Sequence, residues 1–282
     1  MATLAYLLAS VPAAAQVTVG SKNFTEQFVV AELYSQALEA AGIKVERRLN
    51  LGGTLIAHKA LEEKQIDLYP EYTGTMLINV LKAEPMTDRR TVYEKVKAEY
   101  AAKGLVVLNE APMNNTYNMV VLPETAQKYK LETLTDLARV SKDLKLGAGP
   151  EFRDRKDGIP GLKARYGMTF KEDLQMAIGL RYQALANGQV DVVNGYATDG
   201  MIGALQLKRL KDDRNLWPPY YLVAVVRRDA LDANPRIAEV LNQVNALLDD
   251  ATVTGLNYQV DGEKKEPRDV ARAFLKSKGI VK

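Results

Sequence analysis

Residues 17–42 have the sequence VTVGSKNFTEQFVVAELYSQALEAAG, a short β-rich run followed by a helical pattern. Val17 to Gly20 predicts the first strand. Asn23 and Glu26 stand at capping-box positions before a helix that Gly42 is expected to stop. The helix is expected from about Thr25 to Ala41, because apolar side chains recur there at the spacing of one helical face: Val30, Leu33, Tyr34, Ala37, Leu38 and Ala41.

The alternation of strand and helix continues along the chain. Lys44 to Leu49 and Asp67 to Tyr69 predict further strands, with a helix from Thr54 to about Lys64 between them. Another helix is expected to start near Gly74, and Leu105 to Leu108 predicts a strand that leads into a polar segment. This order is typical of α/β units built on parallel sheets.

The chain is expected to cross twice between two lobes. The first crossing is the polar segment Asn109 to Thr116, and the return crossing lies near Trp217, Pro218 and Pro219. We therefore assign residues 16–112 and 219–282 to lobe 1 and residues 113–218 to lobe 2. Short connections of this kind allow a cleft between lobes to open and close by hinge motion. Beyond the first crossing, strands are expected at Tyr117 to Leu122, Lys145 to Gly147, Val190 to Val193 and Tyr220 to Val226, and helices at Leu180 to Ala186, from Pro235 and near Glu266.

Composition excludes several function classes. Of the 282 residues, 47% are hydrophobic and 26% charged, and 38 Lys and Arg against 35 Asp and Glu leave a net charge of +3. The basic residues are scattered, which argues against a nucleic-acid partner. The chain has no Cys and only one His, His58, too few for a thiolate site or a histidine metal cluster. Without a phosphate loop, nucleophile elbow or dinucleotide fingerprint, we expect no enzyme, no cofactor and no metal.

Residues 1–15 are expected to be a signal peptide. The apolar run Leu4 to Val11 is followed by Ala13, Ala14, Ala15 and Gln16, a small-x-small cleavage pattern. No Lys or Arg precedes the run, which suggests that the recorded start is truncated. No Cys follows it to carry a lipid anchor, and no apolar stretch approaches the roughly 18 residues that span a bilayer. We therefore expect a free periplasmic protein.

Tyrosine is frequent, with 14 residues against five Phe and one Trp. Several tyrosines stand where strands are expected to end, and the ligand crevice of an open α/β sheet lies outside the carboxyl ends of its strands. A single Tyr at such a place commonly packs half-buried with its hydroxyl in water. Their presence in both lobes and at both crossings favours a binding site. These residues are Tyr69, Tyr72, Tyr117, Tyr196, Tyr220 and Tyr221.

Five blocks of sequence are distinctive in combination. They are Gly20-Ser-Lys-Asn-Phe-Thr-Glu-Gln27, Leu51-Gly-Gly-Thr54, Asp67-Leu-Tyr-Pro-Glu-Tyr-Thr-Gly-Thr75, Phe152 to Gly158 and Asn194 to Gly200. Together they resemble the substrate-binding proteins of osmoprotectant ABC importers, which take up glycine betaine, carnitine, choline and proline betaine. The similarity runs from Val17 to about Ala273. It implies an α/β, two-lobed periplasmic-binding-protein fold of type II, with two sheets, hinge crossings and a ligand cleft between the lobes.

The resemblance also implies the residues of a binding site. Its members hold a quaternary ammonium in a box of tyrosines and a carboxylate with Lys, Arg and Thr. The cation cage falls on Tyr72, Tyr117, Tyr196 and Tyr220, and the carboxylate end on Lys22, Thr75 and Arg155. Tyr221 is the rival of Tyr220, and Arg153 is the rival of Arg155. Apart from the family, Lys22 suits an exposed strand end, and Arg155 suits a salt bridge with Asp157 or Asp154.

The chemistry of such a ligand agrees with these residue types. A trimethylammonium group donates no hydrogen bond, whereas each tyrosine face attracts it by about 0.5 to 2 kcal/mol. At the carboxylate end, Arg offers two parallel N–H groups and Lys a point charge.

We therefore expect an exported, monomeric binding protein that captures a small quaternary-ammonium ligand and delivers it to the membrane permease of an ABC importer. An alternative is a binding protein for another small zwitterion such as an amino acid, whose amino group would need an acceptor such as Glu71, Asp157 or Asp199. A transferase with a carboxylate base in the cleft and a sensory domain without a permease are further alternatives. The same site residues would suit betaine, choline and carnitine alike.

Overall fold

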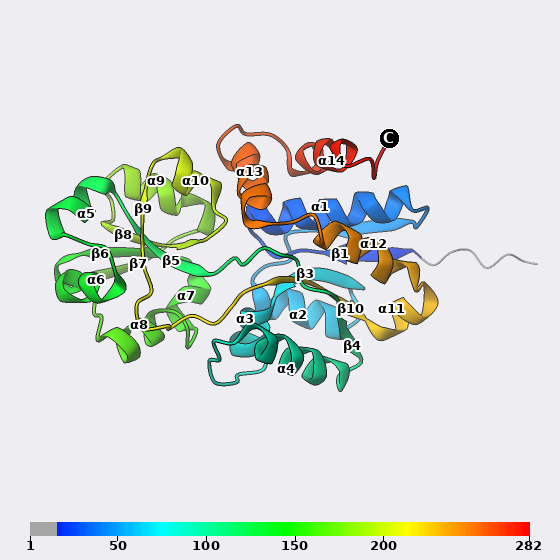
Figure 1. Cartoon of the computed structure of the whole chain (residues 1–282), viewed down its shortest axis with the longest axis horizontal. Coiled ribbons are helices and arrows are strands. Elements are labelled where there is room, and N and C mark those ends of the chain that lie inside the picture. The colour runs from blue at the N-terminus through cyan, green and yellow to red at the C-terminus, as the bar shows by residue number, and fades with distance from the viewer. Residues whose placement is uncertain (1–15) are drawn as a thin grey trace, which may run out of the picture.

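The computed structural model describes residues 16–282, so the predicted signal peptide over residues 1–15 lies outside the described residues. Two bodies lie side by side along the long axis, each with helices around a sheet (Figure 1). Around the first sheet are β1 (Val17–Gly20), α1 (Thr25–Ala40), β2 (Val45–Arg48), α2 (Thr54–Glu62), β3 (Leu68–Tyr72), α3 (Thr73–Thr75), the π-helix η1 (Met76–Val80), α4 (Arg89–Ala101), β4 (Leu105–Val107), β10 (Leu222–Arg227), α11 (Arg228–Ala233), α12 (Arg236–Asn245), α13 (Asp250–Asp261) and α14 (Pro267–Ser277). Around the second are β5 (Tyr117–Val121), α5 (Pro123–Tyr129), α6 (Leu134–Val140), η2 (Ser141–Asp143), β6 (Lys145–Ala148), α7 (Pro150–Asp154), α8 (Ile159–Tyr166), β7 (Glu172–Gln175), η3 (Ile178–Leu180), α9 (Arg181–Ala186), β8 (Val192–Tyr196), α10 (Gly200–Ala204) and β9 (Lys208–Leu210).

The two sheets share one pattern. The first has the strand order β2-β1-β3-β10-β4 and the second β7-β6-β8-β5-β9. In each sheet the consecutive βα units pair in parallel, and the strand that arrives from the other lobe, β10 or β5, pairs antiparallel with its neighbours. The predicted two-lobed α/β fold is confirmed, although the sheets are mixed rather than purely parallel.

Two segments connect the sheets, residues 108–116 and residues 211–221, and they pair with each other. Asn114 and Tyr221 form an antiparallel bridge, and the amide N of Asn115 donates to the carbonyl of Tyr220 at 3.1 Å. The Asn114 side chain accepts a hydrogen bond from the amide of Tyr220 at 2.8 Å. The predicted lobe boundaries at 112/113 and 218/219 fall within these connections and stay a prediction. Paired connections of this kind suit a hinge.

Helix α1 lies between the first sheet and the C-terminal helices (Figure 1). Its contacts with α12, α13 and α14 bury it on more than the single predicted face, and the buried side chains include Glu26, Glu32 and Gln36. Helix α13 also contacts α10 of the second lobe. A Cβ on Gly200 would lie only 2.6 Å from the backbone N of Tyr258, so this glycine allows the close approach of the two lobes.

Two local predictions are corrected. Strand β3 continues past Tyr69 to Tyr72 and includes Pro70, which is tolerated because β3 pairs with β1 only at Leu68, before the proline. The predicted capping box of α1 is wrong, because the N-cap is Phe24 and no side chain caps the helix. The carboxylate of Glu26 is instead turned into the interior of the protein.

Candidate ligand-binding site

A cavity of about 910 Å³ lies between the lobes. All seven predicted site residues line it: Lys22, Tyr72, Thr75, Tyr117, Arg155, Tyr196 and Tyr220. Of the two rivals, Tyr221 packs under the guanidinium of Arg89, 3.7 Å from its ring centroid, and Arg153 pairs with Asp173 at 2.7 Å. The structure therefore brings the proposed set together and leaves both rivals outside the set that lines the cavity.

Five aromatic rings follow one another around the cavity. Tyr117 and Tyr196 have ring centroids 5.4 Å apart, and Tyr220 stands nearly perpendicular to Tyr117 at 5.6 Å. Tyr72, on the first lobe, connects to this group through Phe24, whose ring is 6.4 Å from Tyr72 and 5.7 Å from Tyr196. Phe24 was not predicted as a site residue, although it stands inside the first of the distinctive sequence blocks. The arrangement offers aromatic faces from both lobes to one space.

Secondary structure explains how these rings meet. Tyr72 is the last residue of β3, and Tyr196 is the last residue of β8. Tyr117 is the first residue of β5 and pairs directly with Tyr196 across the antiparallel ladder. Strand ends that point into the cleft therefore position three of the four tyrosines.

The four tyrosines of the predicted cage are neutral phenols. Burial raises the pKa of Tyr72, Tyr117 and Tyr220 well above the usual range, and it raises the pKa of Tyr196 to about 12. The Tyr72 hydroxyl donates to Glu26 Oε1 at 2.6 Å, and the Tyr220 hydroxyl donates to Asp157. Two of the rings are thus held in orientation by buried carboxylates behind the cavity.

Each of the two predicted cationic side chains forms an ion pair with a buried carboxylate. The Nζ atom of Lys22 lies 2.5 Å from Glu71 Oε1 and 4.8 Å from the ring centroid of Tyr72. Arg155 donates from Nε and Nη2 to the two oxygens of Asp157, at 2.8 and 2.6 Å. The salt bridge that sequence offered as the alternative for Arg155 is therefore present. The guanidinium keeps Nη1 for the cavity, 3.4 Å from the hydroxyl of Thr75.

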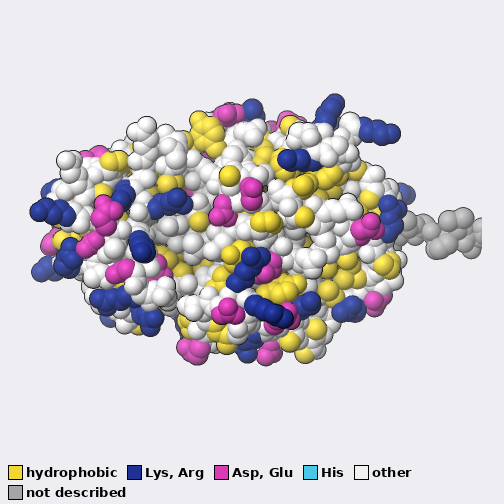
Figure 2. All heavy atoms as spheres, viewed as in Figure 1, with side chains coloured by type: hydrophobic (Ala, Val, Ile, Leu, Met, Phe, Trp, Pro, Cys, Tyr) yellow, Lys and Arg dark blue, Asp and Glu magenta, His cyan; other side chains and the backbone are white. Residues whose placement is uncertain are grey.

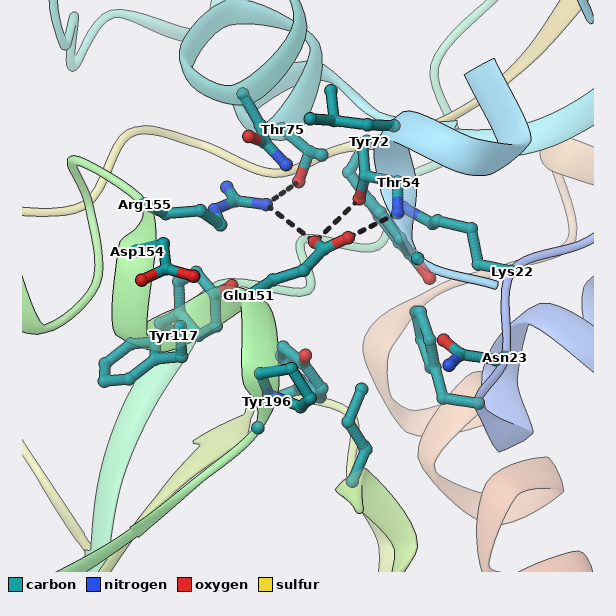
Figure 3. Close-up of a pocket in the computed structure, with 18 of the residues that line it drawn as sticks. Lys22, Asn23, Thr54, Tyr72, Thr75, Tyr117, Glu151, Asp154, Arg155 and Tyr196 are labelled. Atoms are coloured by element: carbon teal, nitrogen blue, oxygen red, sulfur yellow. Dashed lines mark hydrogen bonds and ion pairs between the residues drawn. The ribbon is translucent and has the colours of Figure 1, made fainter. Parts of the chain in front are cut away.

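The carboxylate of Glu151, which was not predicted as a site residue, also lines the cavity. Glu151, on α7, accepts hydrogen bonds from the amide and the hydroxyl of Thr54, the latter at 2.9 Å. Its Oε2 lies 3.8 Å from Nη1 of Arg155. Figure 3 shows the Glu151 side chain pointing from the second lobe toward Thr54 and Arg155.

Behind the cage, Glu26 accepts hydrogen bonds from donors in both lobes. They are the hydroxyls of Tyr72 at 2.6 Å and Thr198 at 2.5 Å, and the side-chain amides of Asn115 at 2.8 Å and Asn257 at 2.9 Å. Burial raises the pKa of Glu26. Since Thr198 follows β8 and Asn257 lies on α13, this carboxylate is hydrogen-bonded to both lobes.

The acidic residues proposed for an amino-acid ligand are engaged elsewhere. Glu71 holds Lys22, and Asp157 holds Arg155 and Tyr220. Asp199 accepts from the hydroxyl of Tyr182 at 2.5 Å, from the guanidinium of Arg181 and from the amide of Tyr196. None of these three carboxylates is left for a ligand ammonium, which weakens the amino-acid alternative.

The sequence and the structure of the chain are both similar to those of known proteins. Residues 15–277 match the model of the substrate-binding domain of ABC-type glycine betaine transport systems. The carnitine transport binding protein OpuCC of Listeria monocytogenes is 34% identical over 263 residues, covering 92% of this chain and 85% of that protein. The crystal structure of a glycine betaine/carnitine/choline ABC transporter superposes with a TM-score of 0.77 at 34% identity, covering 94% of this chain and 99% of the other.

A further relative is longer. The ergothioneine transport permease/ergothioneine binding protein EgtU of Helicobacter pylori strain G27 is 35% identical over 264 residues, covering 93% of this chain. The present chain spans 47% of the length of that protein.

Proposed function

The chain belongs to the family of substrate-binding domains of ABC-type glycine betaine transport systems, and from this premise we propose that it captures glycine betaine or a related quaternary-ammonium osmoprotectant and delivers it to an ABC importer. The protein acts by binding alone, without catalysis. The observation that carries the ligand class is the ring of neutral aromatic side chains around the interlobe cavity: Phe24, Tyr72, Tyr117, Tyr196 and Tyr220.

These rings suit a trimethylammonium group. Such a cation gains nothing from hydrogen-bond acceptors, but each aromatic face attracts it by about 0.5 to 2 kcal/mol and buries its methyl groups. Tyr72 comes from the first lobe and Tyr196 from the second, so only the closed form surrounds the cation. Closure is then coupled to ligand binding, as in a hinge-bending receptor.

The other end of the cavity suits a carboxylate. Nη1 of Arg155, the hydroxyl of Thr75 and the amide of Thr54 at the N-terminus of α2 converge there. A helix N-terminus favours an anion, and the charged donors strengthen its hydrogen bonds. Lys22 contributes its charge at the edge of the cage, paired with Glu71. A zwitterion with one end of each kind fits this division.

We further propose that the protein is exported, acts in the periplasm as a monomer and meets a membrane permease. Substrate-binding proteins of this family work with ABC permeases. Within residues 16–282, no helix combines the length and apolar character that crossing a membrane requires. Basic and acidic side chains are interspersed over the face in Figure 2, in keeping with the net charge of +3.

Calorimetric titration tests the proposal. The panel contains glycine betaine, carnitine, choline and ergothioneine, the last because of the Helicobacter pylori relative. Proline and glycine serve as controls, because they carry no quaternary ammonium. We expect one-to-one binding of at least one quaternary ammonium compound and weaker binding of both controls. No heat and no thermal shift with any quaternary compound at millimolar concentration would refute the proposal.

A further inference from the structure

Glu151 connects the two lobes inside the ligand cavity. It belongs to α7 of the second lobe, and both of its carboxylate oxygens accept hydrogen bonds from Thr54 of the first lobe. The carboxylate thus lies at the N-terminus of α2, between that helix and Nη1 of Arg155. This is the place to which the proposed function assigns the carboxylate of the ligand.

The backbone before α2 leaves room for a carboxylate oxygen close to residue 53. A Cβ on Gly53, the residue before α2, would lie 2.3 Å from Oε1 of Glu151. Any side chain at residue 53 would therefore displace the carboxylate from the helix terminus. Together with the hydroxyl of Thr54, the glycine makes a small cradle that holds one carboxylate group.

Glu151 contacts hydrogen-bond donors of the site that are not already paired with Glu71 or Asp157. Lys22 is held by Glu71, and Arg155 uses Nε and Nη2 for Asp157. What remains for an anion is Nη1 of Arg155, the hydroxyl of Thr75 and the donors of Thr54, and Glu151 lies against the Arg155 and Thr54 groups. A second carboxylate competes with Glu151 for them, because two like charges close together repel each other.

Resting on the proposed function, we propose that Glu151 is a specificity-determining residue that occupies the carboxylate end of the pocket while no ligand carboxylate is present. A ligand with a carboxylate must displace it. A quaternary ammonium alcohol such as choline binds with Glu151 still in place. The Glu151 side chain is 36% exposed, so it has a route out of the pocket toward solvent.

Charge balance favours the same distinction. Lys22 with Glu71 and Arg155 with Asp157 are neutral pairs of buried groups. With Glu151 in place, it and these two pairs together carry one negative charge in excess, which matches a monocation. The other charged residues of the lining, Lys82, Asp154 and Lys156, are exposed, and solvent and salt screen them.

The test compares glycine betaine and choline by calorimetry on the wild-type protein, Glu151→Ala and Asp143→Asn. Asp143 is the matched control, because it lies in the second lobe and carries the same charge but is exposed and is not among the residues that line the cavity. In Glu151→Ala, glycine betaine should bind about tenfold more tightly, since a hydrogen-bonded charge no longer competes with it. Choline should bind equally or more weakly, because a contact between the lobes is lost. Asp143→Asn should leave the ratio of the two affinities unchanged.

An unchanged ratio in Glu151→Ala, or weaker binding of glycine betaine, overturns the inference. So does an equal change in Asp143→Asn, which would assign the effect to overall charge. Small-angle scattering of the ligand-free proteins gives a second readout. Glu151→Ala should have a larger radius of gyration than wild type, and equal radii overturn the inference. If wild-type protein binds no quaternary ammonium, the proposed function fails, and scattering decides alone whether Glu151 links the lobes.

Discussion

Tyr117 and Tyr196 are direct partners in the antiparallel ladder of β5 and β8, and their ring centroids lie 5.4 Å apart at the edge of the interlobe cavity. Cross-strand pairs of this kind fix the distance between two side chains. The antiparallel pairing of β5 and β8 therefore places these two residues of the proposed cage side by side within the second lobe.

The cage should depend on aromatic faces more than on hydroxyls. Tyr117→Phe and Tyr196→Phe should leave ligand affinity within about tenfold, whereas Ala at either position should cost more, because one cation–π contact is worth up to about 2 kcal/mol, or roughly thirtyfold. Calorimetry with glycine betaine measures both. Tyr93→Ala and Tyr129→Ala are controls, since these half-exposed tyrosines lie outside the residues that line the cavity. Equal losses in the controls would mean that the cage is elsewhere.

The other two tyrosines should respond differently to Phe. The hydroxyls of Tyr72 and Tyr220 donate to the buried carboxylates of Glu26 and Asp157. Removing a donor from a buried charge leaves that charge less well satisfied, and this costs about 1 to 3 kcal/mol. Urea denaturation should therefore show a larger loss of stability for Phe at Tyr72 and Tyr220 than at Tyr117 and Tyr196. Four equal losses would contradict these hydrogen bonds.

Breaking the Arg155–Asp157 pair should destabilise the fold. Both side chains are buried, and Arg155→Ala leaves the charge of Asp157 with the Tyr220 hydroxyl as its side-chain donor. Removal of one partner of a buried pair typically lowers the free energy of unfolding by about 3 to 5 kcal/mol. Adding Asp157→Asn should restore part of the lost free energy of unfolding, as measured by urea denaturation. An unchanged urea midpoint in Arg155→Ala would mean that the pair is solvated in solution.

The same double variant separates the two ends of the ligand. If Arg155 contacts a carboxylate, glycine betaine should lose much more affinity than choline, which has none. Calorimetry on Arg155→Ala/Asp157→Asn measures both losses. Equal losses would mean that Arg155 shapes the lobe and does not contact the ligand.

Local sequence patterns predicted most of the fold and the strand-end positions of two of the proposed cage residues. Tyr72 and Tyr196 end strands, and the rule that ligands bind at strand ends singled them out before any side chain was placed. Strands β7 and β9 were missed. The residues of β7 are all exposed, and a short polar edge strand has no apolar alternation to reveal it.

Charge partners could not be predicted in the same way. Glu26 stands three residues after Asn23, a spacing that fits a helix cap, but its partners Thr198 and Asn257 are 172 and 231 residues away in the sequence. Glu151 of the second lobe likewise contacts Thr54 of the first lobe, 97 residues away in the sequence. No local pattern encodes contacts of this range, so the groups that anchor the cage and join the lobes emerge only from the tertiary structure.

Loss of the Thr198 hydroxyl should weaken the closure of the two lobes without removing a contact to the ligand. Thr198→Val keeps the shape but removes the hydrogen bond to Glu26, and Thr198 is not among the residues that line the cavity. Glycine betaine and choline should therefore lose affinity by the same factor, about tenfold for a hydrogen bond to a charged group. The exposed Thr169→Val is the control. A loss confined to one of the two ligands would place Thr198 in ligand recognition rather than in closure.

Glu26 should make stability depend on pH. Burial raises its pKa above the ordinary value of 4.5, so between 4.5 and the raised pKa the folded protein binds more protons than the unfolded chain. The contribution of Glu26 to stability is then fully present below pH 4.5 and is lost as the pH rises through the raised value. Urea denaturation of wild type and Glu26→Gln over a pH series isolates it, because Gln does not titrate. The free energy of unfolding of wild type minus that of the variant should fall as the pH rises, whereas a difference that stays constant or increases would mean that the four donors around Glu26 outweigh its burial.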